Sequence, residues 1–420
     1  MTIIVCDTGS GSVKLGLSSA DNALPTLCVP NVIGEPTVRR GGCEYDQISN
    51  ENETDAMKIL RKFTHNTPSV GPSVITTTTS PTATTVIGDQ VYDFDVIKKF
   101  PMKKGQVVDW DSMSQVWQFS LDKLMSDSNQ LLRSPLHSAS RLNKKRQRAS
   151  NFRGSSIVLS ESIRTFKRDK LFETMFEIFD FDRINVSSQA ALILSARGTN
   201  TGLVVDCGDG LTQITPVSDG FVQKQAVRTL EIAGRRVSER LHDLMRRSDS
   251  SNYKLSNRQC EKIKIDFCFL SRDIEEERFI ADTTNVLSRK VALPDGTEVR
   301  LNRERFLAPE ILFEPKFAGD ASSDSLGIAS AIRDSISSSA IDLRSGLYKS
   351  IMLAGGSSLI PGFSSRLKWE LRDVETSIDE IGSRQFLCFQ GGCVVAQLNE
   401  VKGQEWWISR EDYLEKGANI

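Results

Sequence analysis

The sequence is poor in histidine, and its three histidines, His65, His137 and His242, adjoin no serine or cysteine motif. A nucleophilic triad therefore has no support in the sequence. The eight cysteines form no CxxC pair, and Cys6 and Cys388 lie in apolar runs, which is typical of buried free thiols in a reducing compartment. Any chemistry of this chain must depend on carboxylates, amides, lysines and the backbone.

Long apolar runs and a strong excess of charge are also missing. No apolar run reaches the length of about 18 residues that an ordinary transmembrane helix needs. The first ten residues, MTIIVCDTGS, lack a basic segment, so we expect no secretory signal there. A formal net charge of −1 over 420 residues creates no field that attracts polyanions. We therefore expect no direct nucleic-acid partner and no membrane insertion.

Two stretches lack a hydrophobic period, and we predict that 73–85 and 133–153 are mobile loops. The first reads SVITTTTSPTATT, a polar segment of low complexity. The second contains RLNKKRQR at 141–148, which is either a solvated loop or a segment for partner binding or localisation.

Regular periodicity returns between these stretches. Asp111 is expected to cap a helix. The apolar face of this helix would carry Met113, Val116, Trp117, Leu121 and Leu124. From 156 onward, strand-like and helical segments alternate, which indicates an α/β fold. A helix begun by Pro361 is expected after the strand-like run 351–356.

One pattern occurs twice, about 200 residues apart: DTGSGSVK at 7–14 and DCGDGLTQ at 206–213. Each begins with an aspartate at the end of an apolar run and continues into a Gly-x-Gly turn. Glycine turns expose backbone N–H groups, so two facing turns could clamp a polyphosphate. Asp7 and Asp206 would repel phosphate unless a divalent cation such as Mg²⁺ or Ca²⁺ lay between them, held through water. Lys14 adds a positive charge close to the first turn.

The simpler alternative is two ordinary tight hairpins, since neither stretch is a Walker loop. Their repetition at comparable positions favours a cleft between two similar halves. A third glycine-rich element, LAGGSS at 353–358, follows a strand-like run and could form a wall for adenine and ribose.

These segments resemble the actin family. Beside the two hairpins, the resemblance is carried by FPMKKGQVVDWDSM (100–113), LEIAGR (230–235), LPDGTEVRLNRERFLAPEILFEP (293–315), IDLRSGLYKSIMLAGGSSLIPGFSSRLKWEL (341–371) and WWISREDYLEKG (406–417). It implies an α/β fold of duplicated actin-like ATPase (ribonuclease H-like) domains around a nucleotide cleft. The first domain would span 1–188, with an inserted small lobe at about 30–99 and an extra loop at 126–154. The second would span 189–420, with an inserted lobe at about 233–320.

The resemblance also implies ATP with Mg²⁺ or Ca²⁺ as cofactor, and a set of site residues. Asp7 and Asp206 would organise the water shell of the metal, and Gln189 would position the attacking water, with a weak contribution from Gln213. The remaining residues of the nucleotide site would be Thr8, Gly9, Ser10, Gly11, Lys14, Gly208, Asp209, Gly210, Lys264, Gly355, Gly356, Ser357, Ser358, Leu359 and Ile360.

The chain departs from the family pattern at several of these places. Gln213 replaces a histidine that helps to order the water chain, and glutamine cannot accept a proton at neutral pH. On the nucleoside side, Glu261, Ile265, Gln385 and Ile360 replace an arginine, a glutamate, a lysine and an aromatic residue. We interpret this as retained nucleotide binding that is weaker on the nucleoside side, with at most slow ATP hydrolysis coupled to assembly.

The resemblance therefore implies a non-enzymatic ATP-binding subunit of an actin-nucleating complex in the cytoplasm and cytoskeleton. With a second actin-related protein and other complex subunits, it would start branches on an actin filament. The alternatives are a divergent actin or a nuclear actin-related protein of a chromatin-remodelling complex, which the basic run at 141–148 would favour. A phosphotransferase like the sugar kinases that share this fold is a further alternative, and the absence of a recognisable sugar-binding segment counts against it.

Overall fold

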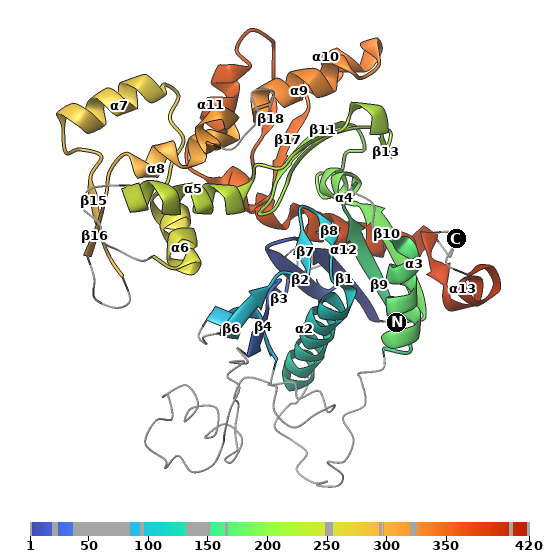
Figure 1. The fold of residues 1–420 in the computed structure, drawn as a ribbon. Helices are drawn as coiled ribbons and strands as arrows, with labels where there is room; N and C mark the ends of the chain where they lie inside the picture. The colour runs from blue at the N-terminus through green and yellow to red at the C-terminus, as the bar shows by residue number, and fades with distance from the viewer. Residues whose placement is uncertain are drawn as a thin grey trace, which may run out of the picture.

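The computed structural model describes residues 2–18, 24–36, 85–92, 96–131, 152–163, 167–247, 255–293, 296, 298–319, 326–402 and 406–417. Most of 73–85 and 133–153, the stretches expected to be mobile, lies outside the described residues. Figure 1 shows two α/β halves, each built around its own twisted sheet, with α12 running between them.

The first sheet has the strand order β19-β10-β9-β1-β2-β3. Strand β1 pairs with β2 in an antiparallel hairpin and with β9 in parallel, and β9 pairs in parallel with β10. The strands are β1 (Thr2–Thr8), β2 (Ser12–Leu17), β3 (Leu27–Pro30), β9 (Ser155–Glu161), β10 (Arg183–Ser188) and β19 (Ile408–Ser409). Strands β1 and β9 are buried along almost their whole length, as expected for central strands that are covered on both faces.

The second sheet repeats this arrangement in the order β13-β12-β11-β17-β18, with β14 also on β12. Strand β11 forms an antiparallel hairpin with β12 and pairs in parallel with β17, which pairs in parallel with β18. The strands are β11 (Gly202–Cys207), β12 (Thr212–Ser218), β13 (Phe221–Val222), β14 (Arg228–Leu230), β17 (Ile351–Ala354) and β18 (Ile378–Asp379). This match of strand order and direction confirms the expected duplication.

Helices cover both sheets, and most of them bury apolar residues in the core. Around the first sheet are α2 (Trp110–Leu131), α3 (Arg168–Glu173) and α13 (Arg410–Lys416). Around the second are α5 (Gly234–Arg247), α6 (Asn257–Phe267), α7 (Ile274–Thr283), α8 (Glu304–Leu307), α9 (Ile328–Ser337), α10 (Ile341–Tyr348) and α11 (Phe363–Glu370). Helix α4 (Gln189–Ser195) packs against α12 (Leu387–Lys402).

Short strands make up the smaller parts. A three-stranded sheet has the order β5-β4-β6, and two two-stranded hairpins lie elsewhere. These strands are β4 (Ile33–Pro36), β5 (Val86–Ile87), β6 (Val96–Lys99), β7 (Met102–Lys103), β8 (Gln106–Val107), β15 (Arg289–Ala292) and β16 (Glu298–Leu301).

The C-terminal part of the chain returns to the first sheet. In α12, Phe389 and Cys393 pack with Ile3 and Val5 of β1, while Leu387 joins the cluster that contains Met352 of β17. Strand β19 then pairs with β10. The domain boundary between residues 188 and 189 remains a prediction. The topology adds that the chain returns from the second half to the first near its C-terminal end.

Two expectations about helix starts are wrong. Asp109, not Asp111, caps α2: its Oδ1 accepts the backbone N–H of Ser112 at 3.1 Å and its Oδ2 accepts the Ser112 hydroxyl at 2.7 Å. Helix α11 begins at Phe363 rather than Pro361, because Gly362 adopts a φ of 86°. The expected apolar face of α2 is confirmed, since its five residues are all buried.

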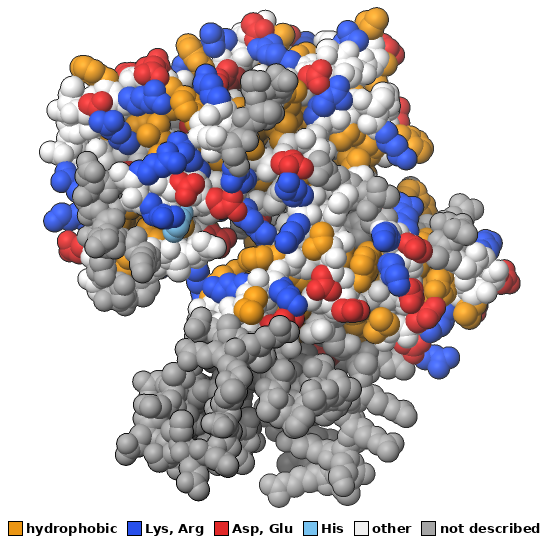
Figure 2. All heavy atoms as spheres, in the orientation of Figure 1, with side chains coloured by type: hydrophobic (Ala, Val, Ile, Leu, Met, Phe, Trp, Pro, Cys, Tyr) orange, Lys and Arg blue, Asp and Glu red, His pale blue; other side chains and the backbone are white. Residues whose placement is uncertain are grey.

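The expectations about thiols and charge can be compared with the described residues. All seven described cysteines are free, and six of them are buried, whereas Cys28 is exposed. On the face shown in Figure 2, basic and acidic side chains are interspersed. No helix in the described ranges combines the length and apolarity that a membrane span requires.

Candidate nucleotide-binding site

The two repeated stretches form the same kind of turn. In the first hairpin the N–H of Gly9 donates to the carbonyl of Ser12, and in the second the N–H of Gly208 donates to the carbonyl of Leu211, both at 3.0 Å. Each turn follows a central strand of its sheet, β1 or β11. The sequence repeat is therefore a structural repeat.

Asp7 has a positively charged partner within its own hairpin. Lys14 lies directly opposite Asp7 in the strand pairing and its Nζ is 2.7 Å from Oδ2. The Ser160 hydroxyl of β9 donates to Asp7 Oδ1 at 2.8 Å. Burial raises the pKa of Asp7, but the charge and hydrogen bond of Lys14, with the Ser160 hydroxyl, outweigh it, so that the pKa falls below its ordinary value.

Asp206 occupies the equivalent position but lacks such a partner. The residue opposite it is Gln213, whose Nε2 donates to the Ser162 hydroxyl at 3.0 Å instead. Burial and the negative charge of Asp7 raise the pKa of Asp206 to about 6, although the positive charge of Lys14 acts in the opposite direction. Within the described ranges, no side chain forms an ion pair with Asp206. The pair of acids thus carries one uncompensated negative charge, which fits a hard divalent cation.

This imbalance predicts a pH dependence of folding for the metal-free protein. The pKa of Asp206 is about 6 in the folded chain against an ordinary 3.8. At pH values between these two, the folded state therefore binds more protons than the unfolded state. The free energy of unfolding should fall as pH rises through this window, by up to about 3 kcal/mol. Denaturant titrations at several pH values would measure this as the difference between wild type and Asp206→Asn. A difference that stays constant between pH 4 and pH 6.5 (about the edges of the window) would contradict the assignment.

The two hairpins approach each other closely. A Cβ added at Gly11 would lie 2.8 Å from Asp209 Cβ, and one added at Gly210 would lie 2.7 Å from Ser10 Cβ. Both distances are too short for a side chain, which explains why both positions are glycine. The described hairpins therefore face each other as the sequence predicted.

Backbone and side-chain contacts anchor the first hairpin to its own half. Asn31 donates from Nδ2 to the carbonyl of Gly9 and from its N–H to the carbonyl of Gly11, both at 3.0 Å. Trp117 of α2 donates from Nε1 to the hydroxyl of Thr8 at 3.1 Å. These contacts leave the turn with a fixed conformation, and pattern reasoning missed them because they join distant segments.

A second group of expected residues meets around Gly234, at the start of α5. The carbonyl of Gly208 accepts the N–H of Gly234 at 3.1 Å and the Ser357 hydroxyl at 2.7 Å. The buried Lys264 donates from Nζ to the carbonyl of Gly234 at 3.0 Å. A Cβ at Gly234 would lie 2.3 Å from Ser357 Oγ, so only glycine allows this junction. The LEIAGR segment carried the signal for Gly234, but its place in the site became visible only in the structure.

The glycine-rich loop after β17 lies against the second acid. Gly355 has a φ of 83°, and a Cβ there would lie 2.5 Å from Asp206 Oδ1. Gly356–Leu359 forms a short 3₁₀ helix. Ser358 accepts from Arg384 Nε at 3.0 Å, and Ile360 is buried. The structure thus brings the third glycine element next to the second hairpin.

The remaining expected residues are placed as follows. Gln189 is the first residue of α4, directly after β10. No hydrogen bond joins it to Gln213 within the part of the chain that the structure describes. Of the divergent positions, Ile265 of α6 is two-thirds exposed, at 66%.

Two sheets of the same topology, with an acidic glycine hairpin from each meeting at their junction, define a two-lobed protein of duplicated α/β halves. The chain belongs to the actin family, whose family model, Actin, matches residues 1–420. The family binds nucleotide with a divalent metal.

Three curated relatives with one name match almost the full length of the chain. The chain is 31% identical over 442 aligned residues to actin-related protein 2 of Caenorhabditis briggsae, covering 99% of this chain and 95% of that protein. It is 30% identical over 438 residues to the protein of that name from Arabidopsis thaliana, covering 99% and 97%. For Saccharomyces cerevisiae the values are 29% over 439 residues, covering 99% and 96%. The resemblance is therefore confirmed at full length.

Proposed function

We propose that this chain is an ATP-binding subunit of a complex that nucleates branched actin filaments. The observation that carries the proposal is the pair of acidic glycine hairpins that meet between the two halves. Full-length similarity to three proteins named actin-related protein 2 supports the assembly role. The partners would be an actin filament, a second actin-related protein and further subunits, in the cytoplasm.

The site residues have distinct proposed roles. Asp7 and Asp206 would hold Mg²⁺ or Ca²⁺ through water, and the bound cation would neutralise phosphate charge. The backbone N–H groups of Ser10, Gly11, Asp209 and Gly210, with Lys14, bind phosphate oxygens. Those of Thr8, Gly9 and Gly208 donate within the protein and hold the turns in shape. Lys264 and the loop Gly355–Ile360 form the nucleoside wall. Positioning and charge neutralisation are what phosphoryl chemistry requires of a protein.

A pull-down of the full chain with mass spectrometry tests the assembly role. A second actin-related protein and small complex subunits should co-purify. Recovery of remodelling ATPases would instead support a nuclear actin-related protein. A chain that purifies alone and phosphorylates a metabolite would support a phosphotransferase.

Asp206→Asn should weaken Mg–ATP binding about 10- to 100-fold, because one charged acceptor of the metal's water shell is lost. Isothermal titration calorimetry would measure the affinity. Asp219→Asn is the matched control: Asp219 lies on the exposed turn between β12 and β13 and its φ of 51° suits asparagine. Equal affinities for wild type and Asp206→Asn would remove Asp206 from the site.

A further inference from the structure

Arg235, the second residue of α5, contacts both hairpins at once. Its Nε and Nη2 donate to Asp209 Oδ2 at 3.0 and 2.7 Å, and Nη2 also donates to the carbonyl of Ser10 at 3.2 Å. Asp209 belongs to the second hairpin and Ser10 to the first. One guanidinium group therefore bridges the two halves at the turns that face each other.

The base and the tip of this arginine are both held in place. Its own N–H donates to the carbonyl of Asp209 at 2.8 Å, so the backbone of α5 is fixed to the second hairpin. Its guanidinium carbon lies 4.4 Å from the ring centre of Phe100, a residue of the first half. A planar guanidinium can stack on a ring and donate a fork of hydrogen bonds together, which an ammonium group cannot do.

Other charged contacts between the halves are more exposed. Lys104 and Glu231 are 54% and 51% exposed, and Arg258 and Asp89 are 52% and 69% exposed at a separation of 4.0 Å. Exposed pairs of this kind contribute little. The side chains of Arg235 and Asp209 are 29% and 25% exposed, and their contact is charge-assisted. Arg235 is thus the strongest of these bridges.

We propose that Arg235 is a positioning residue that locks the two phosphate-binding hairpins together and thereby sets the rate at which nucleotide leaves. The part about release rests on the proposed function, whereas the lock itself does not. When the bridge is broken, the hairpins separate more often, so bound phosphate escapes faster while entry is little changed.

Stopped-flow release of a fluorescent ATP analogue, chased with excess Mg–ATP, tests the rate. Arg235→Met should raise koff about tenfold, equivalent to about 1.4 kcal/mol, with kon within about twofold. Arg235→Lys, which keeps the charge but loses the fork, should give an intermediate koff. Arg236→Met is the matched control, because Arg236 pairs with Glu239 on an exposed part of the same helix. A koff for Arg235→Met equal to that of Arg236→Met would overturn the proposal.

Hydrogen exchange of the nucleotide-free protein separates the lock from the proposed function. Peptides covering 7–14 and 206–213 should exchange faster in Arg235→Met than in wild type, with the remaining peptides unchanged. If Arg235→Met exchanges faster in all peptides because it is destabilised, the comparison is made instead between Arg235→Lys and wild type, on the same two peptides. Unchanged exchange in both segments would overturn the lock. If wild type fails to bind the analogue, the proposed function is overturned. The exchange result alone then tests whether Arg235 holds the two hairpins together.

Discussion

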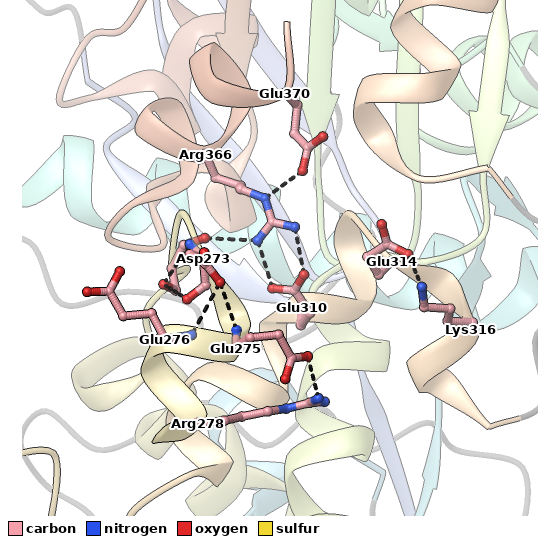
Figure 3. Close-up of polar contacts among 10 residues, drawn as sticks. Asp273, Glu275, Glu276, Arg278, Glu310, Glu314, Lys316, Arg366 and Glu370 are labelled. Carbon is pink, nitrogen blue, oxygen red and sulfur yellow. Dashed lines mark hydrogen bonds and ion pairs between the residues drawn. The ribbon is translucent and has the colours of Figure 1, made fainter. Parts of the chain in front are cut away.

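Glu310→Gln should lower the free energy of unfolding by about 3–5 kcal/mol, because it leaves the buried charge of Arg366 without its main partner. Two guanidinium nitrogens of Arg366 donate to the two oxygens of Glu310 at 2.7 and 3.0 Å, as Figure 3 shows. The side chains are only 6% and 1% exposed. Arg366 also donates to Glu370 and to the carbonyl of Ser271, so its charge cannot leave the interior.

Thermal unfolding measures this loss, which should appear as a fall in Tm of roughly 3–6 °C for a chain of 420 residues. Asp373→Asn is the matched control, because Asp373 forms a comparable pair with Arg333 but is 61% exposed. Because solvent screens that pair, it should contribute little to stability. A fall in Tm of the same size in both variants would contradict the importance of the buried pair.

The buried pair also connects the loop 355–360, the proposed nucleoside wall, to the part of the chain that carries α7. Leu270 donates its N–H to the carbonyl of Pro361 at 2.8 Å. Arg366, on the helix that follows, holds the carbonyl of Ser271, and Asp273 then caps α7 through the N–H groups of Glu275 and Glu276. The loop 355–360 and the start of α7 are thereby fixed to one another.

The second large effect concerns hydrolysis. Gln213→His should raise the rate of single-turnover ATP hydrolysis about 10²-fold, because a histidine there can order water and accept a proton. The position suits this role, since residue 213 lies directly opposite Asp206 in the strand pairing. The unmodified chain should bind ATP and release almost no phosphate over many minutes. Single-turnover phosphate release measures both rates.

The gain should depend on Gln189, the proposed water-positioning residue. Gln189→Ala in the Gln213→His background should return the rate to that of the unmodified chain. Rapid multiple-turnover hydrolysis by the unmodified chain would refute this account of position 213 and favour a phosphotransferase.

Local patterns in the sequence predicted the parts of the fold that local chemistry determines. The Gly-x-Gly turns follow from backbone freedom and from the close approach of the hairpins. The buried face of α2 follows from helical periodicity. The family resemblance extended this to the duplicated sheets, which the observed strand order matches.

What the sequence did not predict depends on contacts between distant segments. Ser160, which binds Asp7, and Ser162, which binds Gln213, are ordinary serines on β9 and just after it until the sheets are assembled. The Arg366–Glu310 pair joins residues 56 positions apart and has no periodic signal. The sequence does not distinguish the cap of α2, because Asp109 and Asp111 are both good capping residues and only the hydrogen bonds to Ser112 identify Asp109.

The central claim is that Mg–ATP binds between the two acidic hairpins, and calorimetric titration of the wild-type chain tests it most directly. One ATP should bind per chain in the presence of Mg²⁺, and the affinity should drop at least about tenfold when EDTA removes the metal, because Asp7 and Asp206 then face the phosphates without a cation. An absence of binding with Mg²⁺ present, or an equal affinity with and without the metal, would contradict the account.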